Sequence, residues 1–205
     1  MRRARLATAR SRLAVVAGLF ALLAACASDQ DKKSAVIAIN EGFRVEYEKL
    51  LADKGSRVYP VGRGDAFVAM RVSLAQLGMR TEQQDQTLGY LAVAGNAPTP
   101  LSDEEWRTAS QADLPLLRKL ITPHVGAAAN FVQFEPQGLQ VVINATFLDA
   151  PRDSTEVSLT VRLREIAPPR SGWPRREYVA PQLLTVGIDK IFATFERELK
   201  AAPQR

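Results

Sequence analysis

The feature that most constrains the fold is a pair of long segments with alternating polarity in the last third of the chain. Apolar residues occupy every second position from Leu139 to Phe147 and again from Val157 to Leu163. The polar positions that alternate with the second set are Ser158, Thr160, Arg162 and Arg164. A period of two with one apolar and one polar face is typical of antiparallel strands that cover a core on one side only. The pattern therefore predicts an antiparallel sheet with one buried and one hydrated face.

Apolar residues at spacings of three and four predict three amphipathic helices that could cover the apolar face. The first follows Asp65, an expected N-cap, and ends at Gly78, where a left-handed residue would stop it. The second begins at Ser102 with a capping box to Glu105, and Pro115 is expected to kink or split it. The third is the longest and covers residues 181–201.

Short strands are predicted between these helices, at residues 58–61, 79–83, 87–94 and 131–134. The predicted fold class is α+β, with a single domain over residues 56–202. Its two layers are an antiparallel sheet and amphipathic helices packed on one face, including the long C-terminal helix. Residues 35–55 combine strand-like and helix-like spacings, so both assignments stay open for them.

The N-terminal segment has the pattern of an export signal. Residues 1–13 contain five arginines and no acidic residue, and the segment from Leu13 to Ala25 carries no charge. This apolar segment is shorter than the roughly 20 residues that span a bilayer. A basic start followed by a short apolar stretch is typical of a secretory signal peptide.

The apolar segment ends in Leu23-Ala24-Ala25-Cys26, which contains the only cysteine of the chain. This motif resembles the lipobox of bacterial lipoproteins, in which the signal is cleaved before the cysteine and the cysteine is acylated. The resemblance implies that residues 1–25 are removed and that acylated Cys26 anchors the chain in a membrane. Residues 27–34 are small and polar and are expected to form a flexible tether. Residues 26–55 therefore comprise the lipidated cysteine, this tether and a segment whose secondary structure the sequence does not decide.

The same resemblance implies a destination. Aspartate after the cysteine would retain a lipoprotein in the inner membrane, and Ala27 stands there instead. This favours the periplasmic face of the outer membrane. Ser28 keeps the inner membrane open as an alternative, because some bacteria also read that position.

The charge balance changes once the signal is removed. The full chain has 27 basic and 22 acidic residues, and removing the five arginines of the signal leaves 22 of each. The mature chain therefore has no net charge. Nucleic acid is not expected as a partner, because nucleic-acid binding rests on an excess of basic residues.

No motif indicates catalysis, a cofactor or a metal site, and the chain is not expected to be an enzyme. His124 is the only histidine, and a structural role is expected for it. The acidic residues from Asp103 to Glu105 lie in the first turn of a predicted helix, where the helix dipole favours them. Gly62-Arg63-Gly64 lacks the third glycine of a dinucleotide site, and Arg63-Gly64-Asp65 is too short a match to indicate cell adhesion.

A cluster of basic residues around Trp173 is the best candidate contact surface. Trp173 lies in a Pro/Gly-rich segment that is expected to be exposed. Such an arrangement could bind an envelope protein partner or anionic lipid headgroups. The cluster consists of Arg162, Arg164, Arg170, Trp173, Arg175 and Arg176.

The helix Ala66–Gly78, the strand that starts at Gly89-Tyr90 and the terminal helix Ile188–Leu199 suggest a further resemblance. A lipidated cysteine before such elements resembles a single helix-grip-like domain, as in the C lipoprotein of the outer-membrane β-barrel assembly machinery or in small proteobacterial lipoproteins. The resemblance implies a non-enzymatic interaction or scaffold module of the cell envelope. An alternative is a carrier of an apolar ligand or lipid, which requires a cavity between the faces led by Val141 and Ile188.

Overall fold

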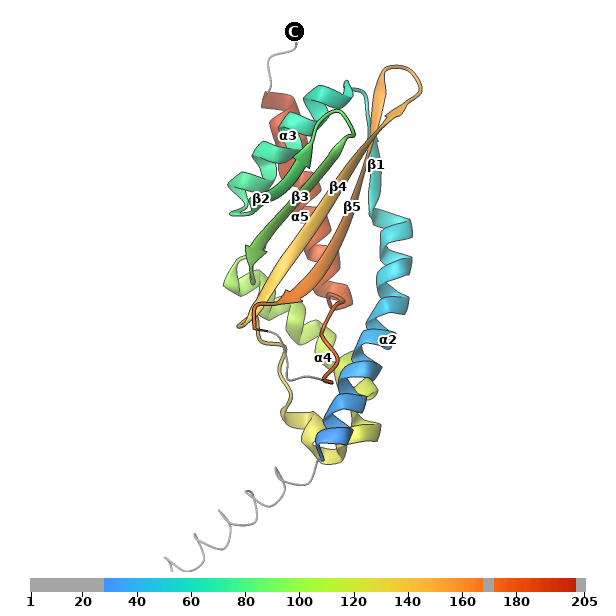
Figure 1. The fold of residues 1–205 in the computed structure, drawn as a ribbon, viewed down its shortest axis with the longest axis vertical. Coiled ribbons are helices and arrows are strands. Elements are labelled where there is room, and N and C mark those ends of the chain that lie inside the picture. The colour runs from blue at the N-terminus through green and yellow to red at the C-terminus, as the bar shows by residue number, and fades with distance from the viewer. Residues whose placement is uncertain (1–27, 168–171, 202–205) are drawn as a thin grey trace, which may run out of the picture.

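The computed structural model describes residues 28–167 and 172–201. The expected signal peptide, Cys26 and Arg170 lie outside these residues. The described part contains four α-helices, one 3-10 helix and a five-stranded antiparallel sheet, so the predicted α+β class is confirmed. Figure 1 shows the elements in chain order. They are α2 (Asp29–Lys54), β1 (Ser56–Tyr59), α3 (Arg63–Gln76), β2 (Arg80–Asp85), β3 (Tyr90–Asn96), α4 (Asp103–Val125), η1 (Gly126–Phe131), β4 (Leu139–Ala150), β5 (Ser154–Glu165) and α5 (Pro181–Ala201).

The sheet has the strand order β1-β5-β4-β3-β2, with every neighbouring pair antiparallel. Its centre is the long β4–β5 hairpin, in which Leu139 pairs with Glu165 and Ala150 with Ser154. The residues of the predicted apolar face, such as Ile143 and Val157, are buried. The alternating pattern therefore produces the sheet that it predicts.

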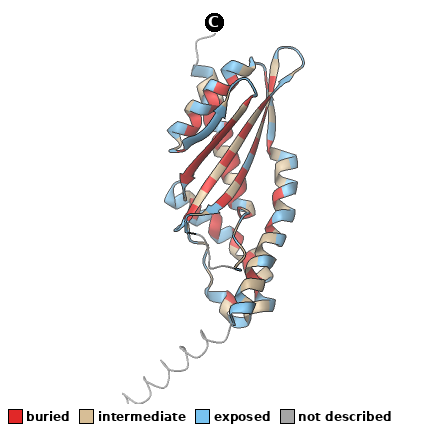
Figure 2. Cartoon of the chain, viewed as in Figure 1, coloured by how far each residue is buried: buried red, intermediate tan, exposed pale blue. Residues whose placement is uncertain are grey.

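Within the described ranges, the helices cover one face of this sheet and leave the other uncovered (Figure 1). α3 and α5 lie across the back of the strands, and α4 crosses below them towards α2. Buried aromatic side chains from α5 and β4 contribute to the core between the layers. Figure 2 shows buried residues along the strands and along the helices that cover them. Val141 and Ile188 are both buried in this one core. The largest fully buried side chains of the interface include Met70, Phe147, Phe192 and Phe195.

The two edge strands differ from the centre of the sheet. β2 has the sequence Arg-Thr-Glu-Gln-Gln-Asp, and its side chains are exposed apart from half-buried Asp85. β1 has four residues and is followed by Pro60, which cannot donate a backbone hydrogen bond. Both edges are therefore poor templates for a further strand.

The expected flexible tether is wrong from residue 28 onward, because Asp29–Lys54 form one continuous helix. Ser28 caps this helix with a capping box: its hydroxyl accepts the Asp31 N–H at 3.1 Å, and the Asp31 carboxylate accepts the Ser28 N–H at 2.9 Å. Two side chains of this helix, Phe43 and Tyr47, are buried in the main core. The folded unit thus begins well before residue 56, and α2 packs against α4 and α5.

Three local predictions are corrected. Residues 131–134 are not a strand: Phe131 ends η1, and the next three residues lie beside α4, where Trp106 Nε1 donates to the Phe134 carbonyl at 3.0 Å. α4 is not split at Pro115, because it continues as a single helix through this exposed residue. Gly62, rather than Asp65, is the N-cap of α3, and Asp65 lies in the first turn.

Candidate functional site

The face of the sheet opposite the helices is the largest candidate surface. We call it the open sheet face and define it by the outward positions of four strands. Along β4 and β5 these positions are half-buried or exposed, whereas the inward neighbours are buried. The defining residues are Glu82, Tyr90, Ala92, Ala94, Asn96, Gln140, Val142, Asn144, Thr146, Ser158, Thr160, Arg162 and Arg164.

Arg164 organises one end of the open sheet face. Its Nε donates to Gln140 at 3.0 Å, and both terminal nitrogens donate to the carboxylate of Glu82. Glu82 lies on β2, so this pair crosses β4 and β3, where the small side chains of Ala92 and Ala94 leave room for it. The Arg164 guanidinium lowers the pKa of the Glu82 carboxyl, chiefly by hydrogen bonding. The pair is thus preorganised in its charged form.

A second chain of hydrogen bonds crosses the middle of the same face. Tyr90 Oη donates to the Asn144 side-chain oxygen at 3.0 Å, and the Asn144 amide donates to Thr160 Oγ1 at 3.3 Å. Since β3, β4 and β5 are neighbours, these bonds link three strands at one level of the sheet. At this level the open sheet face presents hydrogen-bonded polar groups, whereas exposed Leu148 and Val58 lie on the same side of the sheet nearer the hairpin turn.

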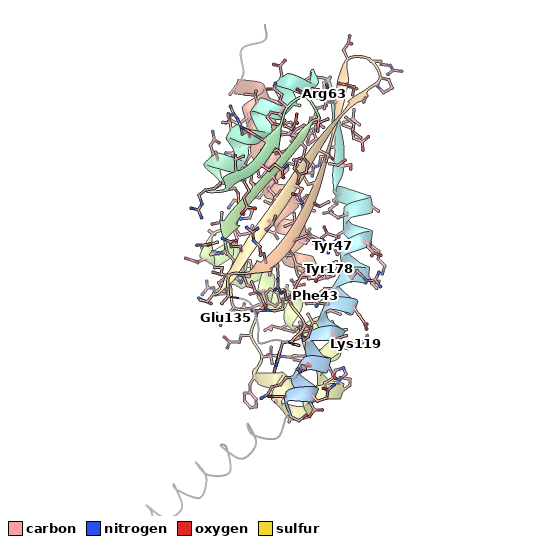
Figure 3. All side chains as sticks on the ribbon, in the orientation of Figure 1. Phe43, Tyr47, Arg63, Lys119, Glu135 and Tyr178 are labelled. Atoms are coloured by element: carbon pink, nitrogen blue, oxygen red, sulfur yellow. The ribbon has the colours of Figure 1, made fainter. Side chains whose placement is uncertain are left out.

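Arg162 marks the boundary between this face and α2. Its guanidinium lies over the rings of Tyr47 and Tyr178, with 4.7 Å and 4.3 Å from the guanidinium carbon to the two ring centroids. The two rings meet edge to face at 5.4 Å between centroids. Figure 3 shows Tyr47 and Tyr178 next to each other between α2 and the sheet. Burial raises the pKa of the Tyr47 hydroxyl. Arg162 therefore joins α2 to the domain by cation–π contacts.

The segment from Gly172 to Tyr178, which we call the Trp173 segment, follows α2 along its length. Lys33 Nζ lies 5.7 Å from the Trp173 ring centroid. One heptad further on, Asn40 Nδ2 donates to the Arg175 carbonyl at 2.6 Å, and Asn40 Oδ1 accepts the Glu177 N–H at 3.2 Å. Another seven residues on, Tyr47 contacts Tyr178. The spacing of seven keeps these three side chains on one side of the helix.

The predicted basic cluster is therefore only partly assembled. Trp173, Arg175, Arg176 and Arg162 follow one another near α2, whereas Arg164 lies on the open sheet face. Arg176 pairs with Glu165 at 2.9 Å, Arg164 with Glu82, and Arg162 with two tyrosines. Arg175 is exposed, and Trp173 is half-buried. Three of the arginines therefore contact partners within the protein, which weakens the cluster as a binding site for lipid headgroups.

Two surface clefts lie on the helical side. One, of about 640 Å³, runs between the start of α4 and α5 and is bordered by Ala109, Ala112 and Val186. The other, of about 530 Å³, separates α4 from residues 130–137. It contains Arg118, whose Nε is buried without a hydrogen-bond partner among the described residues. Neither cleft lies between the faces of Val141 and Ile188.

Two acidic residues of α4, Glu105 and Asp113, have structural partners. Glu105 closes the predicted capping box with Ser102 and also accepts from Lys190, which lowers the pKa of its carboxyl. Buried Asp113 accepts hydrogen bonds from the N–H groups of Gln182 and Leu183 at 3.0–3.2 Å, and so it caps α5 from α4.

Within the described ranges, no group of three His, Cys, Asp or Glu side chains could hold a metal ion. None of the helices in this part of the chain is both long and apolar enough to cross a membrane.

Sequence reasoning missed most of the residues that build the open sheet face and the α2 contact. Tyr47, Tyr178 and Asn40 are far apart in the chain, and no local pattern connects them. The alternation in β4 and β5 did identify Thr160, Arg162 and Arg164 as outward.

Comparison with protein-family models, with curated proteins and with solved structures found no match.

Proposed function

We propose that this protein is a lipid-anchored, non-enzymatic module of the cell envelope that binds another envelope protein through its open sheet face. Acylated Cys26 would hold it at the periplasmic face of the outer membrane. The observation that carries the proposal is the uncovered side of a five-stranded sheet, which bears an ordered hydrogen-bonding surface while helices occupy the other side.

The chemistry of this surface favours a protein partner. Its side chains are fixed by hydrogen bonds before binding, which reduces the entropy lost when a partner docks. A mixture of Tyr, Asn, Thr and Arg is typical of contacts that form between separately folded proteins. The expected carrier function has no comparable support, because Val141, Ile188 and the aromatic residues between the layers are packed in one core.

The anchor is tested with a Cys26→Ala variant and with globomycin, which inhibits the lipoprotein signal peptidase. Loss of the thiol is expected to prevent acylation and to release the protein from the membrane or leave it as an uncleaved precursor. Fractionation and mass spectrometry of the mature N-terminus measure this. A Cys26→Ala protein that is cleaved normally and stays in the membrane would contradict the anchor.

The partner surface is tested by a photo-crosslinking amino acid placed in cells at Thr160, on the open sheet face, and at Arg71, on α3. Both positions are exposed, so they are matched for access. A discrete crosslinked product from position 160 that is missing from position 71 is expected. The Arg164→Glu change should reduce this product, because it breaks the pair with Glu82. Equal labelling from both positions would argue against the open sheet face.

A further inference from the structure

The end of the molecule formed by residues 120–134, which we call the η1 end, has features of a membrane contact. We propose that the η1 end lies against the bilayer, with the Phe131 side chain among the lipid headgroups and upper acyl chains. The inference rests on the acylation of Cys26 under the proposed function. It adds an orientation and a second contact to that anchor.

The first step is the length of the link between anchor and fold. Ser28 is the N-cap of α2, two residues after Cys26. Two residues of fully extended chain reach about 7 Å. The capping box provides acceptors for the backbone N–H groups of Ser28 and Asp31, which fixes the start of the helix at this point. An acylated Cys26 would therefore hold the start of α2 within one helix turn or two of the membrane surface.

The second step is what lies beside the start of α2. Figure 1 shows that α2 begins at the same end of the molecule as η1. α2 packs against α4, and α4 in turn packs against η1. Higher up, Gly42 faces Leu120 of α4. The η1 end is therefore the part of the described chain that the short link brings to the membrane.

The third step is the composition of the η1 end. Residues 120–134 contain no Lys, Arg, Asp or Glu, although charged residues are common elsewhere in the chain. Figure 3 marks Lys119 and Glu135, the charged residues on either side. Phe131 is 78% exposed, the highest value among the large apolar residues of the described part. Ala127, four residues earlier on η1, is also exposed. An uncharged surface with a protruding aromatic ring suits the interface of a bilayer.

The Trp173 segment supports the same orientation. Trp173 lies beside Lys33, which is five residues after Ser28 and thus about 7.5 Å along the helix. Tryptophan and lysine at this height would meet the headgroup region, where both residue types are favoured. Trp173 would then contribute as the expected contact residue, although most of the arginines around it have partners within the protein.

The test uses the full-length acylated protein, purified and reconstituted into vesicles of phosphatidylethanolamine and phosphatidylglycerol. Phe131→Cys and Leu88→Cys variants carry a polarity-sensitive fluorophore, and an Ala127→Cys variant repeats the measurement on η1. Leu88 is a matched control because it is 74% exposed and lies in the turn at the other end of the sheet. The acylated Cys26 thiol is blocked and does not react with the fluorophore.

On reconstitution, the labels at 131 and 127 should shift their emission to shorter wavelength and be quenched by lipids with a nitroxide near the headgroup. The label at 88 should show neither effect. Equal access of an aqueous quencher to 131 and 88, with the protein still floating with the vesicles, would overturn the inference and leave the anchor intact. A shift without nitroxide quenching would place Phe131 against protein and overturn it too. Failure to float with the vesicles would remove the anchor and the inference together.

Discussion

At the scale of single residues, Arg162 shows how a side chain on the hydrated face of a strand can be recruited by the fold. Its guanidinium lies between Tyr47 of α2 and Tyr178 of the Trp173 segment. The guanidinium carbon lies 4.7 Å and 4.3 Å from the two ring centroids, and the guanidinium is more weakly hydrated than the ammonium of lysine, so less hydration is lost at this contact. Arg162 therefore holds three separate parts of the chain together.

Replacing Arg162 with lysine is expected to destabilise the protein by about 1 kcal/mol, because each cation–π contact contributes roughly 0.5–2 kcal/mol. Urea unfolding followed by circular dichroism measures the change. Arg175→Lys is the matched control, since Arg175 is exposed and only its backbone carbonyl is bound. If both variants unfold at the same urea concentration, the contacts of the guanidinium with the two rings contribute nothing to stability.

Asp113 is a second residue whose role comes from tertiary structure. The residue before α5 is Ala180 and its first residue is Pro181, so no local side chain caps this helix. Asp113 of α4 accepts the N–H groups instead. Burial raises the pKa of the Asp113 carboxyl, and the two backbone bonds partly oppose that rise.

The raised pKa has a definite consequence for stability. The folded state binds the Asp113 proton more readily than the unfolded state, so this contribution is complete below the unfolded pKa of 3.8 and is lost as pH rises through the folded pKa. The stability of the natural protein relative to Asp113→Asn should therefore increase as pH falls from neutral towards about 4. Urea titrations of both proteins across this range measure it. A difference that does not change with pH would contradict the expectation.

At the scale of elements, α2 marks the limit of the sequence-based prediction. The alternation of β4 and β5, the Ser102–Glu105 capping box and the periodicity of α5 are local signals, and the structure follows them. α2 carries only a few buried residues, so its apolar pattern is weak. The Ser28–Asp31 spacing was its available signal, because serine followed by an acid three residues on is typical of a helix start.

The α2–α4 contact depends on close approach at Gly42. A Cβ there would lie 2.5 Å from Leu120 Cδ2, so Gly42→Ala should displace the Leu120 side chain and destabilise the protein by about 1 kcal/mol. Gly187→Ala on α5 is the matched control, because a Cβ at Gly187 meets nothing within 4 Å. That change should stabilise the helix by roughly 0.4–1 kcal/mol. Thermal unfolding of the two variants should shift in opposite directions, and a parallel shift would refute the packing argument.

At the scale of the whole molecule, the short link and the η1 end together define an upright orientation. The β4–β5 hairpin would extend away from the membrane, with its turn furthest from the surface (Figure 1). The open sheet face would then be presented sideways, within reach of a partner in the same membrane or in the periplasm. The sequence could not predict this arrangement, since it depends on where α2, α4 and η1 meet.

Lengthening the link should separate the anchor from the orientation. A flexible Gly/Ser insertion of roughly 20 residues between Ala27 and Ser28 has a root-mean-square span of about 25 Å. The inserted protein should still float with vesicles, but the label at position 131 should lose much of its quenching by nitroxide lipids. Unchanged quenching would mean that the η1 end binds the bilayer without help from the short link.

On a membrane, the polar β2 edge and the short β1 edge would prevent neighbouring molecules from pairing through their sheets. Proteins confined to a surface meet one another in two dimensions, at local concentrations far above those in the surrounding fluid. Upright neighbours would repeatedly bring their sheet edges together, and unprotected edges would join into continuous ribbons. The charged side chains of β2 and Pro60 beside β1 discourage such joining. The same molecule can therefore be crowded on a bilayer and still keep its sheet available to a different protein.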